Sequence, residues 1–331
     1  MSENISYPIG GIDYPRTLQE FDEWFSSEDD CIKYLQKLRW PNGFKCPICN
    51  GGKAWMMSRG VLWCAKCKRQ TSPIAGTIFE GTRKPLRLWF QAMWYITSQK
   101  FGGNALGLQR VLGLGSYQTA WSWLHKMRRA MVRPGRNRLC GTIEVDETLV
   151  GGESHGGKRG RGAERKNIVV IAIEIFSPKG FGRVRMRRIE DASNSSLIPF
   201  VCDSIESGSI VHTDGWRGYN GLTEYSYTHI KKNISESGDP AHVVMPGVHR
   251  ISALLKRWLL STHQGAVSND HMDYYLDEYT FRFNRRKSKA RGMLFYRLLQ
   301  QAVKIGPVPY NKIIQKNNAL PVNLIQQERN G

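Results

Sequence analysis

Four cysteines in two pairs have the spacing of metal ligands. Cys46 and Cys49 form one Cys-x-x-Cys pair, Cys64 and Cys67 form a second, and fourteen residues separate the pairs. Two such pairs can surround one Zn²⁺ with four thiolates in tetrahedral geometry. A thioredoxin-like redox site, the alternative for this motif, requires only one pair. The sequence therefore predicts a structural zinc ribbon.

Two aspartates later in the chain are candidates for metal-dependent chemistry on phosphates. Asp146 lies in the middle of a predicted strand, TIEVDETLV, and Asp214 ends another, SIVHTD. If these strands are neighbours, the carboxylates come together, and a divalent cation such as Mg²⁺ offsets their repulsion. Such a site can activate a water molecule or a 3′-hydroxyl. On spacing alone, each aspartate could equally be a cap or a surface residue.

The elements that must position these aspartates follow from periodicity. A nearly continuous apolar run over 167–176 is typical of a buried strand, and the alternation over 182–190 is typical of an edge strand. The predicted fold class is α/β, with a mixed sheet. Its expected strands cover 142–150, 167–176, 182–190, 209–214 and 225–232, and its expected helices cover 193–205, about 248–263 and about 270–284.

A helix-turn-helix is predicted ahead of this α/β region. An apolar i, i+3, i+4 pattern from Leu86 indicates one helix, Asn104 caps a short second helix, and Ser116 caps a longer third one. A helical packing module without DNA contacts is the alternative. In the DNA-binding interpretation, the third helix contacts base edges first and phosphates further along. The predicted contacts are Gln118, Thr119 and Ser122 for base edges, and Lys126, Arg128 and Arg129 for phosphates.

The charge of the chain favours a polyanionic partner. Its 331 residues include 48 Lys and Arg against 28 Asp and Glu, a formal net charge of +20. Residues 83–138 contain eleven basic residues and no acidic one. Because ordinary protein surfaces mix both signs, this stretch is typical of a phosphate-binding surface. Double-stranded DNA is the predicted partner.

The hydrophobic pattern argues against a membrane protein. Hydrophobic residues make up 40% of the chain, enough for folded cores, but no run of about 18 apolar residues occurs. The N-terminal residues lack the layout of a signal peptide. We therefore expect a cytoplasmic protein with reduced thiols that is not associated with a membrane.

The ordered set of motifs resembles a known family. CPIC, CAKC, GTIEVDET with its Val-Gly-Gly loop, HTDGWRGY, SALLKRW and DYYLDEYTFRFNRR follow one another between about residues 18 and 300. In this order they resemble the transposases of bacterial and archaeal insertion sequences, which carry an N-terminal zinc ribbon and a DDE-type, RNase-H-like catalytic domain. The resemblance implies an enzyme that cleaves and joins DNA strands with Mg²⁺ or Mn²⁺.

The resemblance also implies the catalytic residues. Asp146 and Asp214 match the first two ligands of the catalytic divalent ion. The third ligand of the family, usually Glu or Asn, lies seven residues before a basic residue, which here is Lys256, so His249 occupies its position. Lys256 is expected to hold a DNA phosphate near the metal, or else to be an ordinary solvated lysine.

His249 departs from the family pattern. An imidazole is a better ligand for Mn²⁺ than for Mg²⁺, so the change either alters the metal preference or marks an inactive relative. Glu236 and Asp239 are the alternative third ligands. Trp216 is expected either to stack on a base or to pack in the fold. Three arginines are expected to contact the DNA backbone: Arg282, Arg285 and Arg286.

Together these features predict a DNA transposase that binds element ends and target DNA as a homodimer or larger synaptic assembly. The alternatives are a non-catalytic, domesticated or decayed DNA-binding relative and a Mg²⁺ nuclease without strand transfer. The expected segments are a helical segment (1–40, helical over 18–39), a zinc ribbon (41–82), a helix-turn-helix region (83–138), the catalytic domain (139–305) and a tail (306–331).

Overall fold

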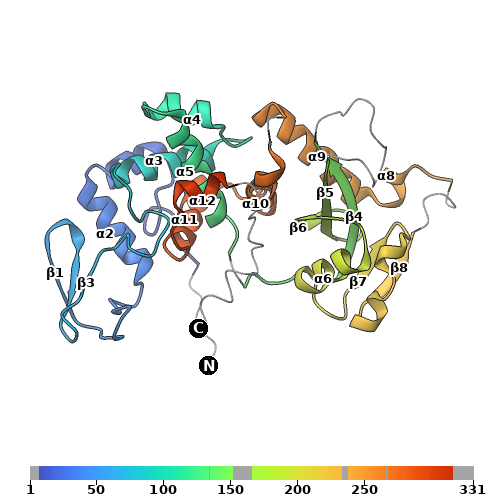
Figure 1. Ribbon diagram of the computed structural model, residues 1–331, viewed down its shortest axis with the longest axis horizontal. Helices are drawn as coiled ribbons and strands as arrows, with labels where there is room; N and C mark the ends of the chain where they lie inside the picture. Colours follow the sequence, from blue (N-terminus) through green and yellow to red (C-terminus); the bar gives the residue numbers. More distant parts are fainter. Residues whose placement is uncertain (1–6, 134, 152–165, 233–237, 266, 316–331) are drawn as a thin grey trace. The chain divides into compact units, whose positions relative to one another are not determined.

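The chain folds into two units, drawn as ribbons in Figure 1. The computed structural model describes residues 7–133, 135–151, 166–232, 238–265 and 267–315. Of these, residues 7–133 and 287–315 form the first unit, and the described residues between 135 and 286 form the second.

The second unit is built on a five-stranded sheet with the order β6-β5-β4-β7-β8. β4, β5 and β6 pair antiparallel, whereas β7 runs parallel to both β4 and β8. This arrangement confirms the predicted α/β class with a mixed sheet, and every strand lies within three residues of its predicted bounds. The strands are β4 (Thr142–Val150), β5 (Asn167–Ile175), β6 (Phe181–Ile189), β7 (Ile210–Thr213) and β8 (Thr228–Lys231).

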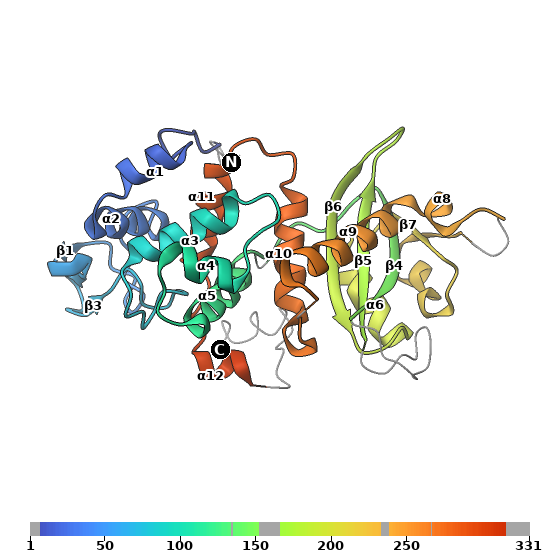
Figure 2. The same cartoon turned by 90° about the horizontal axis from the view of Figure 1, so that it is seen from above.

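Helices cover both faces of this sheet, as Figure 2 shows. α9 (Pro246–His263) and α10 (Met272–Asn284) pack on one face, and α6 (Asn194–Ser204) packs on the other. Successive side chains of a strand point to opposite faces, so the apolar run of β5 supplies both cores, with Ile171 facing α9 and Val170 facing α6. A short helix, α8 (Ala241–Val244), precedes α9.

An aromatic core holds the helices of the first unit together. Phe295 of α11 lies 5.4–5.9 Å, between ring centroids, from four rings of the N-terminal helices, namely Phe21, Phe25, Phe90 and Trp94. The helices of this unit are α1 (Leu18–Trp24), α2 (Glu28–Arg39), α3 (Leu86–Ser98), α4 (Ala105–Leu112), α5 (Tyr117–Ala130), α11 (Arg291–Ala302) and α12 (Tyr310–Ile314).

The helix expected over 18–39 is two helices in the structure. Ser27 begins α2 with a capping box, in which its side chain accepts a hydrogen bond from the backbone N–H of Asp30 while Asp30 accepts one from the backbone N–H of Ser27. A capping box satisfies backbone donors that only a helix start leaves free, so it separates α2 from α1.

The predicted caps of α4 and α5 are confirmed. The Asn104 side chain accepts a hydrogen bond from the backbone N–H of Gly107 at 2.7 Å, and Ser116 accepts one from Gln118 at 3.2 Å. Gly113, with a φ of 60°, ends α4 in the left-handed region that favours glycine. α5 is held to α3 by Trp123, whose ring stacks on Trp89 at 3.9 Å.

The cysteine pairs lie in a small antiparallel sheet of the first unit. Its strands are β1 (Ala54–Met56), β2 (Leu62–Cys64) and β3 (Gln70–Thr71), in the order β1-β2-β3. Cys64 ends β2, and Cys67 lies in the turn that leads to β3.

The two units divide the chain differently from the predicted segments. The predicted catalytic domain extends to residue 305, but the residues from Lys287 to Gln315 belong to the first unit. The physical reason is the aromatic core, since Phe295 and Leu298 on α11 are completely buried there.

Candidate functional site

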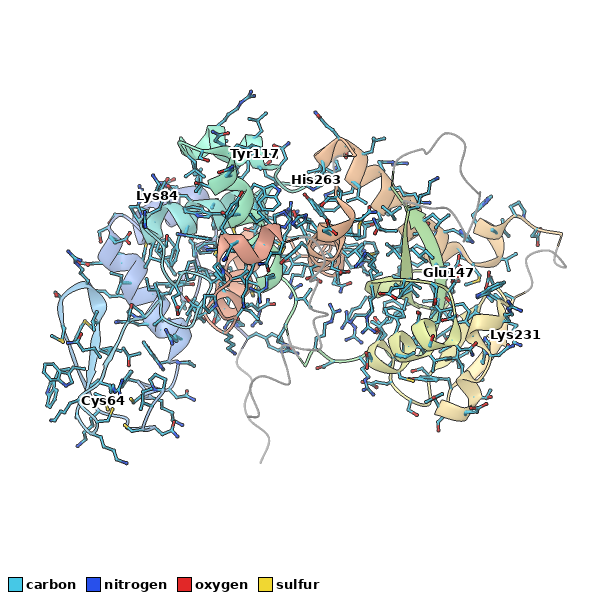
Figure 3. The ribbon with its side chains drawn as sticks, viewed as in Figure 1. Cys64, Lys84, Tyr117, Glu147, Lys231 and His263 are labelled. Carbon is cyan, nitrogen blue, oxygen red and sulfur yellow. The ribbon has the colours of Figure 1, made fainter. Side chains whose placement is uncertain are left out.

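The four cysteines of the zinc ribbon converge on one point. The ligand atoms of Cys46, Cys49, Cys64 and Cys67 all lie within 4.8 Å of one another, and Figure 3 labels Cys64 among the sulfur atoms. The Sγ atoms of Cys46 and Cys67 are 3.6 Å apart, and those of Cys49 and Cys64 are 3.5 Å apart. A tetrahedron with Zn–S bonds of about 2.3 Å has edges of about 3.8 Å, so the residues fit a zinc ion.

Backbone amides prepare two of these thiols for binding a metal. The backbone N–H of Cys67 lowers the pKa of the Cys64 thiol to about 6. The backbone N–H of Cys49 likewise lowers the pKa of Cys46. Because the thiolate is the form that binds metal, both shifts favour zinc at neutral pH.

In the second unit, β4 and β7 carry the two predicted catalytic aspartates. The strands are parallel neighbours, with Glu144 opposite His212. Two residues further along, Asp146 on β4 and Asp214, directly after β7, lie at the same level. Burial raises the pKa of the Tyr219 hydroxyl, and the nearby carboxylates of Glu147, Asp146 and Asp214 raise it further. The register of the two strands therefore places the two aspartates side by side on neighbouring strands.

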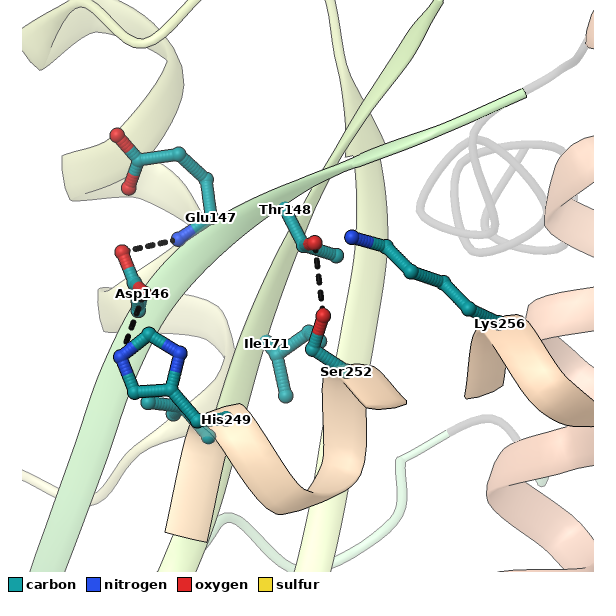
Figure 4. Close-up of a pocket in the computed structure, with 8 residues that line it drawn as sticks. Asp146, Glu147, Thr148, Ile171, His249, Ser252 and Lys256 are labelled. Carbon is teal, nitrogen blue, oxygen red and sulfur yellow. Dashed lines mark hydrogen bonds and ion pairs between the residues drawn. The ribbon is translucent and has the colours of Figure 1, made fainter. Parts of the chain in front are cut away.

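Helix α9 brings His249 to Asp146. The Nε2 atom of His249 lies 4.0 Å from Oδ2 of Asp146, and Figure 4 shows the imidazole pointing toward this carboxylate. Among the described residues this buried Nε2 has no hydrogen-bond partner. Burial lowers the pKa of His249 below its ordinary 6.5, so the imidazole is neutral at pH 7. A neutral imidazole nitrogen without a partner, beside a carboxylate, fits a metal ligand.

Lys256 lies on the same side of α9. A small pocket of about 150 Å³ is lined by Asp146, His249, Ser252 and Lys256, together with Glu147, Thr148, Ile171 and Val248. His249 and Lys256 are seven residues apart and Ser252 lies between them, so all three face the pocket from two turns of one helix.

The two aspartates and His249 are less tightly grouped than the cysteines. Within the described ranges, the four cysteines alone form a group of three or more ligand residues with all ligand atoms within 4.8 Å of one another. Asp214 is not among the residues that line the pocket. Its Oδ1 accepts a hydrogen bond from the backbone N–H of Trp216 at 2.9 Å, which fixes the carboxylate at the end of β7.

A buried carboxylate that the sequence pattern does not single out joins β4 to α9. Glu144 is only 2% exposed, and its Oε2 accepts hydrogen bonds from the backbone N–H groups of Gly247, at 2.7 Å, and Val248, at 3.1 Å. Free N–H groups at a helix N-terminus favour a negative charge. A Cβ on Gly247 would lie 2.8 Å from this oxygen and 2.5 Å from Ile175, so only glycine allows the close approach.

The contacts between β4 and α9 repeat along the strand. Glu144 binds the start of α9, Asp146 lies beside His249, and the Oγ of Ser252 donates a hydrogen bond to Oγ1 of Thr148 at 2.8 Å. Residues 144, 146 and 148 share one face of the strand, because side chains alternate. One face of β4 therefore sets the position of the helix that carries His249 and Lys256.

The opposite face of β4 carries a second acid that sequence reasoning missed. Oε2 of Glu147 accepts a hydrogen bond from the hydroxyl of Tyr219 at 2.7 Å. Tyr219 belongs to the HTDGWRGY motif and is completely buried. This bond ties the segment after Asp214 to β4 and helps to hold the two aspartates together.

Four further residues named from the sequence lie away from the pocket or outside the described ranges. Glu236 lies outside the described residues, and Asp239 is not among the residues that line the pocket. Trp216 packs against the core under α6, and its indole N–H donates a hydrogen bond to the carbonyl of Ala192 at 2.7 Å. Arg286 is exposed and donates to the carbonyls of Gly182 and Phe181, so it braces the start of β6, and its contact with DNA stays a prediction.

The predicted DNA contacts on α5 differ in exposure. Gln118 is exposed, and Thr119, Lys126 and Arg129 are half-buried. Ser122 is only 9% exposed, and its hydroxyl donates to the carbonyl of Thr119 at 3.0 Å. Arg128 is 1% exposed. The expectation that Ser122 and Arg128 face DNA is wrong. α4, α11 and α12 pack around α5, so residues outside its apolar face are buried as well.

Comparison with known families agrees with this two-part organisation. Residues 26–70 match the transposase zinc-ribbon domain, and residues 138–284 match the ISXO2-like transposase domain. Together the two matches cover more than half of the chain. The chain belongs to the insertion-sequence transposases that combine these two domains.

Relatives of this transposase occur in archaea and bacteria. An uncharacterized protein in the transposable element ISH50 of Halobacterium salinarum is 28% identical over 279 residues, which cover 78% of this chain and 91% of that protein. An uncharacterized transposase-like protein of Haemophilus influenzae is 26% identical over 112 residues, which cover 34% of this chain and 89% of that protein.

No helix in the described part of this transposase has both the length and the apolarity needed to cross a membrane.

The cysteine geometry predicts one Zn²⁺ per chain. Metal analysis of the transposase purified without chelator is expected to find about one zinc ion, and Cys64→Ser is expected to abolish its retention because only three thiolates remain. Cys140→Ser, which removes an exposed thiol outside the ribbon, is the matched control and should keep the zinc. Zinc-free wild-type protein would contradict the assignment.

The Glu144 contact predicts a local effect on α9. Glu144→Ala leaves two buried N–H groups without an acceptor, which costs about 2–4 kcal/mol. Hydrogen exchange at Gly247 and Val248 should therefore accelerate at least tenfold, whereas Glu144→Gln, which keeps an oxygen acceptor, should show a smaller change.

Glu224→Ala removes an exposed acid of the same unit and serves as the control for Glu144→Ala. Unchanged exchange at Gly247 and Val248 in Glu144→Ala would show that Glu144 does not hold the helix.

Proposed function

We propose that this transposase binds the ends of an insertion sequence, cleaves a phosphodiester at each end and transfers the resulting 3′-hydroxyl to target DNA. The observation that supports the proposal is the position of Asp146 and Asp214 at the same level of two neighbouring parallel strands, with His249 4.0 Å from Asp146, within a region that matches the ISXO2-like transposase domain. The relative in the transposable element ISH50 supports it.

Asp146, Asp214 and His249 would hold the catalytic divalent ion. Two carboxylates suit either Mg²⁺ or Mn²⁺. The imidazole nitrogen makes the set a better fit for Mn²⁺ than for Mg²⁺. When bound, the ion neutralises charge on the scissile phosphate and activates the attacking oxygen.

The residues of the chain supply positioning. Lys256 offers its ammonium to a phosphate oxygen from the same helix side as His249, and Glu144 fixes that helix against β4. In the first step, a water oxygen attacks phosphorus and the bond to the 3′-oxygen breaks, which leaves a free 3′-hydroxyl. In the second step, this hydroxyl attacks a phosphodiester of the target and displaces its 3′-oxygen.

The first unit supplies DNA binding in this proposal. The segment 83–138 acts as a helix-turn-helix region, in which Gln118 and Thr119 at the start of α5 contact base edges while Lys126 and Arg129 contact phosphates. The zinc ribbon, 41–82, adds a second contact. Because two element ends must be joined, the active form is a homodimer or larger assembly, acting at the nucleoid of a prokaryotic cytoplasm.

A second function is favoured by one residue. His249 replaces the usual Glu or Asn, and a decayed relative that binds DNA without cutting it would carry such a change. Incubation of the protein with its own element ends, target DNA and either Mg²⁺ or Mn²⁺ decides between the functions. Joined product supports the transposase, cleavage without joining indicates a nuclease, and binding alone indicates the decayed relative.

Substitutions at the proposed ligands are expected to separate chemistry from binding. Asp146→Ala and Asp214→Ala should lower cleavage at least 1,000-fold, roughly 4 kcal/mol of transition-state stabilisation, and leave affinity for element ends within about twofold. His249→Ala should lose most activity, whereas His249→Glu should retain part of it and shift the preference from Mn²⁺ towards Mg²⁺.

The pH profile of cleavage is the second readout of the same variants. His249 binds metal only when neutral, and burial lowers its pKa below 6.5, so wild-type activity should persist at pH 6.5 and fall only as the pH drops further. The His249→Glu variant should lack this step, because a carboxylate protonates at lower pH. Full activity of His249→Ala would remove His249 from the site.

DNA binding by α5 is tested with two classes of variant. Lys126→Ala or Arg129→Ala should weaken binding to all DNA sequences. Each should also reduce the slope of log K against log salt concentration by about one, because one fewer counterion is released on binding. Gln118→Ala or Thr119→Ala should chiefly reduce the preference for element ends over random duplex. Titrations in which neither class differs from wild type would exclude α5 from the DNA interface, and Ser122→Ala is the buried control.

A further inference from the structure

The zinc ribbon presents two neighbouring tryptophans to solvent. Trp55 on β1 lies directly opposite Trp63 on β2, and Trp63 lies opposite Gln70 on β3. Paired residues of neighbouring strands point to the same face of a sheet, so the two indoles and Gln70 share one face. Trp55 is 58% exposed and Trp63 is 36% exposed. Adjacent exposed aromatic residues on a sheet usually mark a binding surface.

Positive charge surrounds this aromatic face. Residues 41–79 contain six basic residues and no acidic one, and all six are exposed: Lys45, Lys53, Arg59, Lys66, Lys68 and Arg69. The Nζ of Lys68 lies 5.1 Å from the centroid of the Trp55 ring. The surface therefore combines flat aromatic rings with cations, which matches a ligand that is both aromatic and anionic.

A nucleic acid strand has this combination, and its unpaired form fits best. In a duplex the faces of the bases are stacked on one another, and only their edges and the phosphates are accessible. An indole can stack on a base only where the base is unpaired, and every base offers such a face. An apolar protein segment would match the two indoles and leave the six cations unmatched.

We infer that the Trp55–Trp63 face of the zinc ribbon binds unpaired bases of a DNA strand, with Lys68 and its basic neighbours on the phosphates. This inference rests on the proposed function, because strand cleavage at an element end frees a strand that can separate from its complement. The zinc ribbon then holds the freed strand by stacking, without regard to its sequence.

The test compares three labelled DNAs with the full-length, zinc-loaded protein: oligothymidine of about 20 nucleotides, a blunt duplex of the element end, and the same end with an unpaired tail. Trp55→Ala and Trp63→Ala should each weaken binding to oligothymidine and to the tailed end about tenfold. Both should leave affinity for the blunt end within about twofold. Trp55→Phe, which keeps a ring, should recover part of the loss.

Met56→Ala is the matched control. Met56 follows Trp55 on β1, is 63% exposed, and points to the opposite face, so its removal should change no affinity. The zinc content of each variant reports whether the ribbon is folded, and only variants with about one Zn²⁺ per chain are compared.

Three results would overturn the inference while the proposed function stands. The first is that wild-type protein binds the blunt end and has no affinity for oligothymidine. The second is that zinc-loaded Trp55→Ala binds each of the three DNAs with the same affinity as wild type. The third is that the tryptophan variants change sedimentation of the protein alone, which would make the face a protein interface. A wild-type protein that binds none of the three DNAs removes the proposed function as well.

Discussion

The hydrogen bonds between the Glu144 carboxylate and the start of α9 are the constraint on which the second unit's site depends. Glu144 lies 103 and 104 residues before its two partners, so this contact fixes a late helix on an early strand. Without an acceptor, the first N–H groups of α9 would be buried and unsatisfied. These bonds fix the position of α9 along β4. That position brings His249 close to Asp146 and Ser252 close to Thr148.

Much of the fold followed from local pattern. The strands of the second unit were predictable because β5 is continuously apolar and β6 alternates, and the zinc ribbon was predictable because its four ligands lie in two short motifs. Asp146 and Asp214 are candidates from the sequence because each lies in or at the end of a predicted strand. Only the strand order shows that β4 and β7 are parallel neighbours.

What the sequence did not predict depends on contacts between distant segments. The role of Glu144 requires knowing which helix starts above it, and a buried acid in a strand has no local signature. A single apolar stripe along the helix predicts that Ser122 lies on the exposed side of α5. The structure buries most of α5, since α11 and α12, from the far end of the described chain, also pack on it. The bond between Tyr219 and Glu147 was likewise invisible, because 72 residues separate them.

The return of the chain to the first unit through α11 has a consequence for the order of folding during synthesis. The ribosome makes all strands and helices of the second unit before it makes Phe295, which completes the aromatic core of the first unit. Phe21, Phe25, Phe90 and Trp94 must therefore wait for α11, while the later-made second unit can already close its own two cores. In the nascent chain, the part synthesised first is therefore completed last, and until then the rings that Phe295 covers lack this partner.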